Sequence, residues 1–468
     1  MTDNIITSGR LLLVRPGLVL TTANTTGGAG SGAASGLSNI SLFGHGQSNA
    51  VYANDQDGAL LNMAQAVSAY LGGTGTPAKF SGPASDVGGA GVYAGVSGWG
   101  SFLTYGGDSA PAASAAGYTE EGAAMIPWIT ALTGAEKAQT LAGIIYWGET
   151  DSALTAFSGS GGLGYADKPV YKAALLNDFG QIRTAFGKTA ARMPLALFGP
   201  PYGTPAGSAM VREAWAELAA VPANNLVWAV PQTYDSITRG DNWNAATGVE
   251  STGTPNPGHR AAADNVALYQ RGSLAVARAI LASNGLATSL LPASLGGGIG
   301  PQIVAATLSG TTVVITIQHE GGTDLVVPVL SSPNGTDAPL PAQGVGFSVM
   351  DGGSITAPGS IIQAVSCARL DATHLNLTLA RAPTNAASAC RLFYPWPGEY
   401  WADQPLTEIG RGCAITDNFG TVAVAANYDL NLLLGAGWRV NMPIGSPVTV
   451  TGSGASATAT FGIALTSA

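Results

Sequence analysis

Three short stretches of the chain carry residue types that together could perform acyl transfer. The first is GHGQSN at residues 44–49, which follows a short apolar run and contains Ser48. A serine on such a turn can expose its hydroxyl as a nucleophile, and the backbone N–H groups beside it can stabilise an oxyanion. Taken alone, the string is equally well explained as a glycine-rich turn with a serine that caps a helix.

The second stretch is NPGH at residues 256–259, which places His259 ahead of a long segment with helical periodicity. A serine nucleophile needs a base, and imidazole is the side chain whose pKa suits that task near pH 7. A lone histidine is more often a capping or surface residue, but the first 285 residues contain only His45 besides His259. The third stretch, WGETD at residues 147–151, puts polar groups after an apolar run, where solvated acids are also common.

These stretches fall between segments that alternate strand and helix patterns. Apolar runs typical of buried strands occupy residues 40–43, 78–80, 141–147, 193–198 and 226–230. Helical spacing of apolar residues occupies residues 58–71, 119–132, 170–186, 208–220 and 259–283. This alternation predicts a parallel sheet with helices on both faces, and such sheets bind ligands at the carboxyl ends of their strands. The three stretches are all expected at that edge.

The remainder of the chain has a different character. Residues 286–300 are rich in Gly, Pro and Ser. Short β runs follow between turn residues, at 312–317, 325–330, 375–379, 390–394 and 448–451. We therefore expect an N-terminal arm and Gly/Ser/Thr-rich linker over residues 1–38, an α/β domain over 39–285, a linker over 286–300, and an all-β, sandwich-like domain over 301–468.

The composition argues against several classes of function. The chain has 19 Lys and Arg against 28 Asp and Glu, and its net charge of −9 disfavours nucleic-acid binding. No uninterrupted apolar run reaches about 18 residues, so no membrane insertion is expected. Three cysteines without a CxxC pair argue against a zinc site or a disulfide framework, although one disulfide would be possible. We expect no metal and no other cofactor.

The location of the protein is less tightly constrained. The apolar residues 11–14 are followed by Arg15 and Pro16, which favours a strand or an arm over a secretion signal. A low-charge chain rich in Gly, Ala, Thr and Ser is nevertheless typical of proteins that work outside a cell. We expect an extracellular or virion-associated protein, with a cytoplasmic location and the oligomeric state left open.

The ordered set of GQSN, a mid-chain strand ending in GE-S/T-D and a histidine opening the last helix resembles the SGNH/GDSL hydrolase superfamily. Within it, the resemblance is closest to the sialate O-acetylesterase and acetylxylan esterase group of carbohydrate esterases, and it covers roughly residues 39–283. It implies a flavodoxin-like α/β/α fold and removal of acetyl groups from sugar hydroxyls without a metal. The favoured function is therefore a serine esterase whose substrate is an acetylated carbohydrate.

The resemblance also implies roles for individual residues. Ser48 would be the nucleophile and His259 the general base. The backbone N–H groups of Ser48 and Gly122 would form the oxyanion hole, with Gly117 as the alternative to Gly122. His45, three residues before Ser48, is expected to have a structural role at the strand end rather than to line the site.

The sequence departs from the family's pattern at two positions. Trp147 replaces a glutamine whose amide helps to form the oxyanion hole, and an indole N–H differs from that amide in length and direction. Asn256 stands three residues before His259, where the family has the acid. Either the site works as a Ser–His dyad or another acid orients the imidazole. The candidates in the preceding loop are Asp241, Asp235 and Glu250.

Contacts to substrate are expected from side chains around the same edge. These are Gln47, Asn49, Glu149, Trp99 and Trp243. Glu149 matches the glutamate of the family's QGE, and the tryptophans could stack on sugar C–H faces or serve only to anchor loops. The alternative function is a glycan-binding structural or virion tail-type protein with weak or no catalysis. A lipase-like or thioesterase activity ranks lower, because the loops are short and polar.

Overall fold

The computed structural model describes residues 6–7, 10–11, 36–46, 48–81, 103–104, 117–118, 120–152, 165–199, 204–231, 238–240, 255–260, 262–327, 346–394, 415–445 and 448–468. For residues 6–7, 10–11, 48, 81, 103–104, 117–118, 120–124, 149–150, 238–240, 255–259 and 288 the backbone alone is described. In the predicted N-terminal arm, β1 (Ile6–Thr7) pairs with β2 (Arg10–Leu11), and most of the predicted linker lies outside the described residues.

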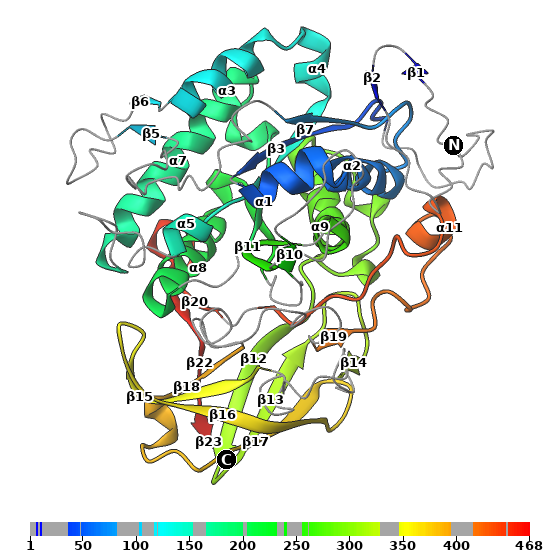
Figure 1. Ribbon diagram of the computed structural model, residues 1–468. Coiled ribbons are helices and arrows are strands. Elements are labelled where there is room, and N and C mark those ends of the chain that lie inside the picture. The colour runs from blue at the N-terminus through cyan, green and yellow to red at the C-terminus, as the bar shows by residue number, and fades with distance from the viewer. Residues whose placement is uncertain are drawn as a thin grey trace.

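A five-stranded parallel sheet forms the centre of the first half of the chain (Figure 1). Its strands are β3 (Ser41–Gly46), β4 (Ala78–Ser81), β7 (Thr140–Tyr146), β8 (Leu195–Phe198) and β9 (Leu226–Val230). They lie in the order β4-β3-β7-β8-β9, and every neighbouring pair is parallel. Numbered along the chain, this is the order 2-1-3-4-5 of flavodoxin-like sheets, so the predicted parallel α/β architecture is confirmed.

Helices cover both faces of this sheet. One face carries α2 (Ala59–Tyr70) and α9 (Ala262–Ser283), and the other carries α3 (Glu120–Ala131), α7 (Lys168–Ala185) and α8 (Pro205–Ala219). Each helix begins and ends within three residues of its predicted range, and α9 starts at Ala262 rather than at His259. Among the described segments we find no helix whose length and hydropathy would suit a membrane span.

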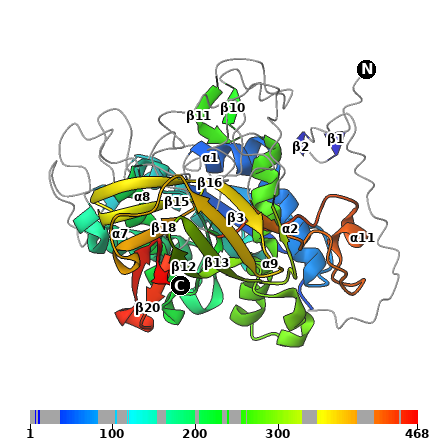
Figure 2. The ribbon, with the colours of Figure 1, turned by 90° about the horizontal axis from the view of Figure 1, so that it is seen from below.

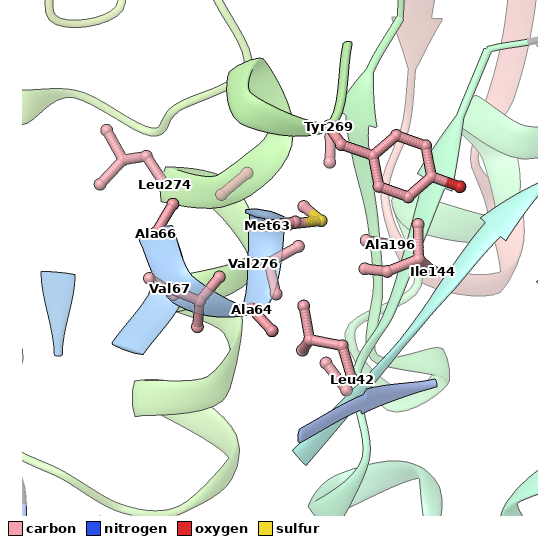
Figure 3. Packing of buried hydrophobic residues seen from close by; sticks show 14 of the residues in the cluster. Leu42, Met63, Ala64, Ala66, Val67, Ile144, Ala196, Tyr269, Leu274 and Val276 are labelled. Carbon is pink, nitrogen blue, oxygen red and sulfur yellow. The ribbon is translucent and has the colours of Figure 1, made fainter. Parts of the chain in front are cut away.

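Alternating side chains of the strands supply the two cores between these layers. Leu42, Ile144 and Ala196, from three neighbouring strands, pack against Met63 of α2 and Val276 of α9 (Figure 3). Residues at the intervening strand positions face the other layer, where α3, α7 and α8 pack. Because both faces are buried, the strands are apolar along most of their length, which is why they are recognisable in the sequence.

Short elements complete the α/β half. They are α1 (Ser48–Val51), the π-helix η1 (Tyr52–Gln56), β5 (Leu103–Thr104), β6 (Gly117–Tyr118), α4 (Gly134–Gln139), α5 (Glu149–Ser152), η3 (Tyr165–Asp167), η4 (Ala190–Arg192), η5 (Pro222–Asn224), β10 (Thr238–Gly240), β11 (Pro255–Arg260), η6 (Thr288–Leu290) and η7 (Ala293–Leu295).

The described part of the second half contains a large eight-stranded sheet, where the sequence predicts a sandwich. Its order is β22-β18-β15-β16-β17-β13-β12-β23. The strands are β12 (Gln302–Ser309), β13 (Thr312–Gln318), β15 (Ser348–Ser354), β16 (Ala357–Arg369), β17 (His374–Leu379), β18 (Cys390–Phe393), β22 (Ile463–Ala464) and β23 (Thr466–Ser467). Strands β22 and β23 are consecutive in the chain but pair with opposite edges of the sheet, so the last residues close it nearly into a barrel (Figures 1 and 2). Closure covers edges that would otherwise expose unpaired backbone groups.

Part of the predicted β domain returns to the α/β half. Strand β14 (Leu325–Val326) pairs with β19 (Thr416–Asp417), and α11 (Leu430–Leu434) packs against α2. Leu430 is buried in the same core as α2 and α9. Residues from both sides of position 301 therefore share one core.

Two buried carboxylates of α8 join the halves of the molecule. Strand β20 (Val448–Thr451) and strand β21 (Thr458–Phe461) form a hairpin beside α8. The N–H of Phe461 donates to Glu213 at 2.8 Å, and the N–H of Ala459 donates to Glu217 at 3.0 Å. Four helical residues rise about 6 Å and two strand residues about 6.6 Å, so the spacing of the acceptors matches that of the donors.

Glu217 also binds two lysines of α7. Its oxygens lie 2.8 Å from Lys168 Nζ and 2.7 Å from Lys172 Nζ. Burial alone would raise the pKa of Glu217, but the hydrogen bonds from Lys168, Lys172 and the Ala459 N–H outweigh it and lower that pKa. The lowered pKa means that Glu217 stabilises the folded state above the ordinary pKa of a glutamate, and that this contribution is lost as the pH falls through the folded value.

We expect Glu217→Ala to lower the free energy of unfolding at pH 7 by about 2–3 kcal/mol, because it removes charged hydrogen bonds and leaves a buried N–H without its acceptor. Glu217→Gln keeps an acceptor and is expected to lose less, but to flatten the decline in stability below about pH 4.5. Denaturant titrations from pH 7 to pH 3 measure both effects. Equal stability of the Ala variant and the wild type would contradict the role given to this contact.

Candidate active site

The turn after β3 brings the chain from the sheet directly into α1. A Cβ at Gly46 would overlap the backbone carbonyl oxygen of Tyr146 on the neighbouring strand β7, so only glycine fits there. Ser48, two residues later, is the first residue of α1. Between β3 and β7 the strand order reverses, and doubly wound sheets bind ligands at the carboxyl ends of strands at such a point. The backbone of Ser48 therefore lies where the sequence predicts it.

The turn after β7 lies next to it. Gly148 has a φ of +107°, a conformation that favours glycine, and α5 begins at the following residue, Glu149. Trp147 is 1% exposed, and its ring meets the ring of His45 edge to face with 4.5 Å between centroids. Trp147 belongs to the core between the sheet and α3, α7 and α8, which favours a packing role for its side chain. Its predicted part in an oxyanion hole stays a prediction.

His45 belongs to the core between the sheet and α7. It is fully buried, and its Nε2 lies 3.4 Å from Oδ2 of Asp178, which is also fully buried. Burial raises the pKa of Asp178, and the nearby His45 only partly offsets this effect. This burial favours the structural role predicted for His45, which stays a prediction. Gly44 and Gly46, at the alternate strand positions, face the other side of the sheet and meet residues of η1 and α1.

Asp178 is a polar residue that the sequence analysis did not single out. It follows Tyr171 and Leu175 on the buried face of α7 and precedes Ile182 on the same face. An acid on an otherwise apolar helical stripe is a visible signal in the sequence, because such a residue is rarely buried unless it has a partner.

His259 lies in a strand, which corrects the prediction that it opens the last helix. Strand β11 pairs with β10, with Arg239 opposite Asn256 and Thr238 opposite Arg260. One step along β10 thus corresponds to four residues of β11, and residues 257–259 form a bulge. Bulges are common beside active sites, where they redirect a side chain. Pro257 and Gly258 disfavour helix at this point, so α9 begins only after the bulge.

A buried hydrogen bond joins this bulge to the turn that carries Ser48. The backbone N–H of Arg260 donates to Oδ1 of Asn49 at 3.0 Å, across 211 residues of sequence. The side chain of Asn49 is fully buried where it accepts this bond. Its predicted contact to substrate stays a prediction. The residues that flank this bond are Ser48 on one side and His259 on the other. The structure therefore brings together the two backbone segments that the sequence analysis linked.

Further contacts hold α9 against the segment after α1. Tyr269 donates its hydroxyl to Oδ1 of the buried Asn54 at 2.8 Å, and Asn265 donates to Asp57 at 2.8 Å. Asn54 lies in η1, whose wider turns are often found at functional sites. Periodicity in the sequence does not reveal this π-helix, and these contacts were not predicted.

The oxyanion-hole glycine has two predicted positions with different surroundings. Gly122 is the third residue of α3, and the first N–H groups of a helix have no partner within the helix. Gly117 lies in β6 and pairs with Thr104 of β5. A donor at the start of a helix suits an oxyanion better than one in a strand pair, which favours Gly122.

The other predicted site residues are only partly described. The backbones of Asn256 and Glu149 lie in β11 and α5, but no side-chain positions are described for Ser48, His259, Asn256 or Glu149. Gln47, Asp241, Asp235, Glu250, Trp99 and Trp243 lie outside the described residues.

Within the described ranges, no group of three or more His, Cys, Asp or Glu side chains could hold a metal ion. Cys367 and Cys390 are not disulfide-bonded, and Cys413 lies outside the described residues.

The fold and site define a doubly wound α/β unit with a candidate acyl-transfer centre at its switch point, joined to a nearly closed β-sheet. No family model matches the sequence, and no curated protein matches it either. Among solved structures, the chain is similar to a carbohydrate acetylesterase from Xanthomonas citri, with 14% identity and a TM-score of 0.34. The alignment covers 87% of this chain and 79% of that one.

Proposed function

We propose that this protein is a serine esterase that removes O-acetyl groups from a carbohydrate through an acetyl-serine intermediate. The observation that carries the proposal is the 3.0 Å bond from the Arg260 N–H to Asn49, because it holds the neighbours of Ser48 and His259 together at the switch point of the sheet. The ordered sequence motifs supply the nucleophile and the base.

In the first step, Ser48 Oγ attacks the acetyl carbonyl carbon while His259 accepts the hydroxyl proton. Negative charge develops on the carbonyl oxygen, and the N–H groups of Ser48 and Gly122 are the proposed donors to it. The bond to the sugar oxygen then breaks, and His259 returns the proton to the leaving hydroxyl. In the second step, water attacks the acetyl carbonyl carbon of the acetyl-serine while His259 takes a proton from the water. The bond to Ser48 Oγ then breaks, His259 returns the proton to that oxygen, and acetic acid leaves and ionises to acetate.

The third member of the proposed site is the group that accepts the Nδ1–H of the imidazole. Asn256 pairs with Arg239, and the next pair along the ladder joins Pro255 to Gly240. Asp241 follows Gly240 in the chain and lies outside the described residues, so it stays a candidate acid on the sequence alone. We propose that either Asp241 or Oδ1 of Asn256 accepts the Nδ1–H of His259.

We expect Asn256→Asp to leave kcat similar or to raise it, because a carboxylate orients imidazole and stabilises imidazolium better than an amide does. Asp241→Asn is expected to lower kcat by about 10⁴-fold if Asp241 already holds the imidazole, as loss of the triad acid does in a serine protease. Initial rates of acetate release from the two single variants and the double variant decide between the candidates. A large loss in Asn256→Asp would contradict both assignments.

We further propose that Gln47, Glu149, Trp99 and Trp243 contact the sugar, and that the protein works outside a cell or on a virion. The test of function is acetate release from a panel of acetylated polysaccharides by the wild type and by Ser48→Ala. Release by the wild type alone supports the esterase. Retention on an acetylated polysaccharide without any release would favour a glycan-binding structural protein instead.

A further inference from the structure

We infer that Asn49 is a positioning residue, whose side-chain oxygen fixes the backbone at His259 relative to Ser48. The inference rests on the proposed function and adds to it a residue that touches neither the substrate nor the reacting atoms. It starts from the bulge in β11 and from the buried hydrogen bond that follows this bulge.

The pairing of β10 with β11 does not by itself fix the backbone position of His259. Asn256 is paired with Arg239, and the next pair joins Arg260 to Thr238, so residues 257–259 have no opposite residue in the ladder. A bulge of three residues can adopt several paths unless its far end is held. The bond from the Arg260 N–H to Asn49 lies at that end, one residue beyond His259.

Asn49 is well suited to hold this end. It is the second residue of α1, next to Ser48, and its side chain is fully buried. The path into α1 is fixed by Gly46, which fits tightly against the carbonyl oxygen of Tyr146. The short, buried side chain of Asn49 therefore fixes the position of the bulge relative to the turn after β3. Misplacement of a catalytic group by about 1 Å can lower turnover by about 100-fold.

The alternative is that this bond contributes only to stability. A neighbouring contact provides a comparison, because the Tyr269 hydroxyl donates to Asn54 in a buried bond between α9 and the segment after α1. Tyr269 lies ten residues beyond His259, well inside α9. A purely structural role predicts similar consequences for the loss of either bond, whereas a positioning role predicts a loss of turnover at Asn49 alone.

The experiment compares Asn49→Leu, which keeps the approximate size but loses the acceptor, with Asn49→Asp, which keeps the acceptor, and with Tyr269→Phe. We expect Asn49→Leu to lower kcat for acetate release by about 100-fold with KM changed less than about threefold. Tyr269→Phe should stay within about threefold of the wild type in both constants, and Asn49→Asp should recover at least about tenfold of the loss. Thermal unfolding should show similar midpoint shifts for Asn49→Leu and Tyr269→Phe.

A second measurement covers the case in which Asn49→Leu does not fold. Asn49→Ala, which suits a helix, should then show the same loss of kcat, together with faster hydrogen exchange of the Arg260 amide than in the wild type. Equal kcat for the Asn49 variants and Tyr269→Phe, in an active wild type, would overturn the inference alone. A wild type that neither releases acetate nor reacts at Ser48 with a fluorophosphonate would overturn the proposed function, and the inference would fall with it.

Discussion

Ser48→Ala is expected to lower kcat for acetate release by at least 10³-fold and by as much as about 10⁶-fold. The range follows from the loss of the nucleophile in other serine hydrolases, where binding and the oxyanion hole retain some acceleration over water. The free energy of unfolding should change by about 1 kcal/mol or less, since Ser48 is the first residue of a short helix and alanine is compatible with that position.

Three measurements test this expectation. Initial rates of acetate release give kcat and KM, thermal denaturation gives stability, and peptide mass analysis after fluorophosphonate treatment shows which residue reacts. Ser38→Ala is the matched control, because Ser38 is an exposed serine shortly before β3 and has no proposed part in the chemistry. Activity of Ser48→Ala within tenfold of the wild type would remove Ser48 from the mechanism.

The local pattern of apolar residues predicts the bounds of the strands and helices that are buried in the α/β half. Strand β9 begins and ends at the predicted residues, Leu226 and Val230, and β7 is shifted by one residue at each end. Helices α2 and α7 likewise follow their apolar spacing. These elements are recognisable because burial imposes a continuous requirement on neighbouring residues.

Strands whose stability depends on distant residues were not predicted. Strand β15 contains Asp351 followed by two glycines, which is typical of a turn. The carboxylate of Asp351 accepts hydrogen bonds from the N–H groups of Thr384 and Asn385 at 2.8 and 2.9 Å. Such partners, more than 30 residues away, compensate for a buried acid but leave no trace in the local pattern. Closure of the sheet by β22 and β23 depends on distant pairing in the same way.

In the candidate site, too, some features follow from local sequence and others depend on distant residues. The positions of Ser48 and Glu149 after adjacent strands could be predicted, because the carboxyl ends of parallel strands share one edge. The strand that contains His259 could not be predicted, because it forms only by pairing with β10. The bond between Asn49 and Arg260 also depends on the assembled sheet, so the local sequence pattern does not reveal it.

His259→Ala should lower kcat by at least about 10³-fold with little effect on stability, whereas His45→Ala should do the reverse. His259 is the proposed base, and loss of the histidine of a catalytic triad costs about as much as loss of the serine. His45 is fully buried beside Asp178 and Trp147, so its removal leaves a cavity and takes a partner from a buried acid. We expect that loss to cost about 2–4 kcal/mol of unfolding free energy.

The dependence on pH and a chemical rescue separate these two histidines further. An imidazole base is active when neutral, so wild-type kcat should decline on acidification through about pH 6.5, with a slope of one proton. Added imidazole should restore part of the activity of His259→Ala, because it can supply the missing base from solution. It should not restore His45→Ala, whose folded fraction is expected to be active already. If His45→Ala loses turnover while remaining folded, and His259→Ala stays active, then His45 is the base, and the buried pair of His45 and Asp178 would have to open during the reaction.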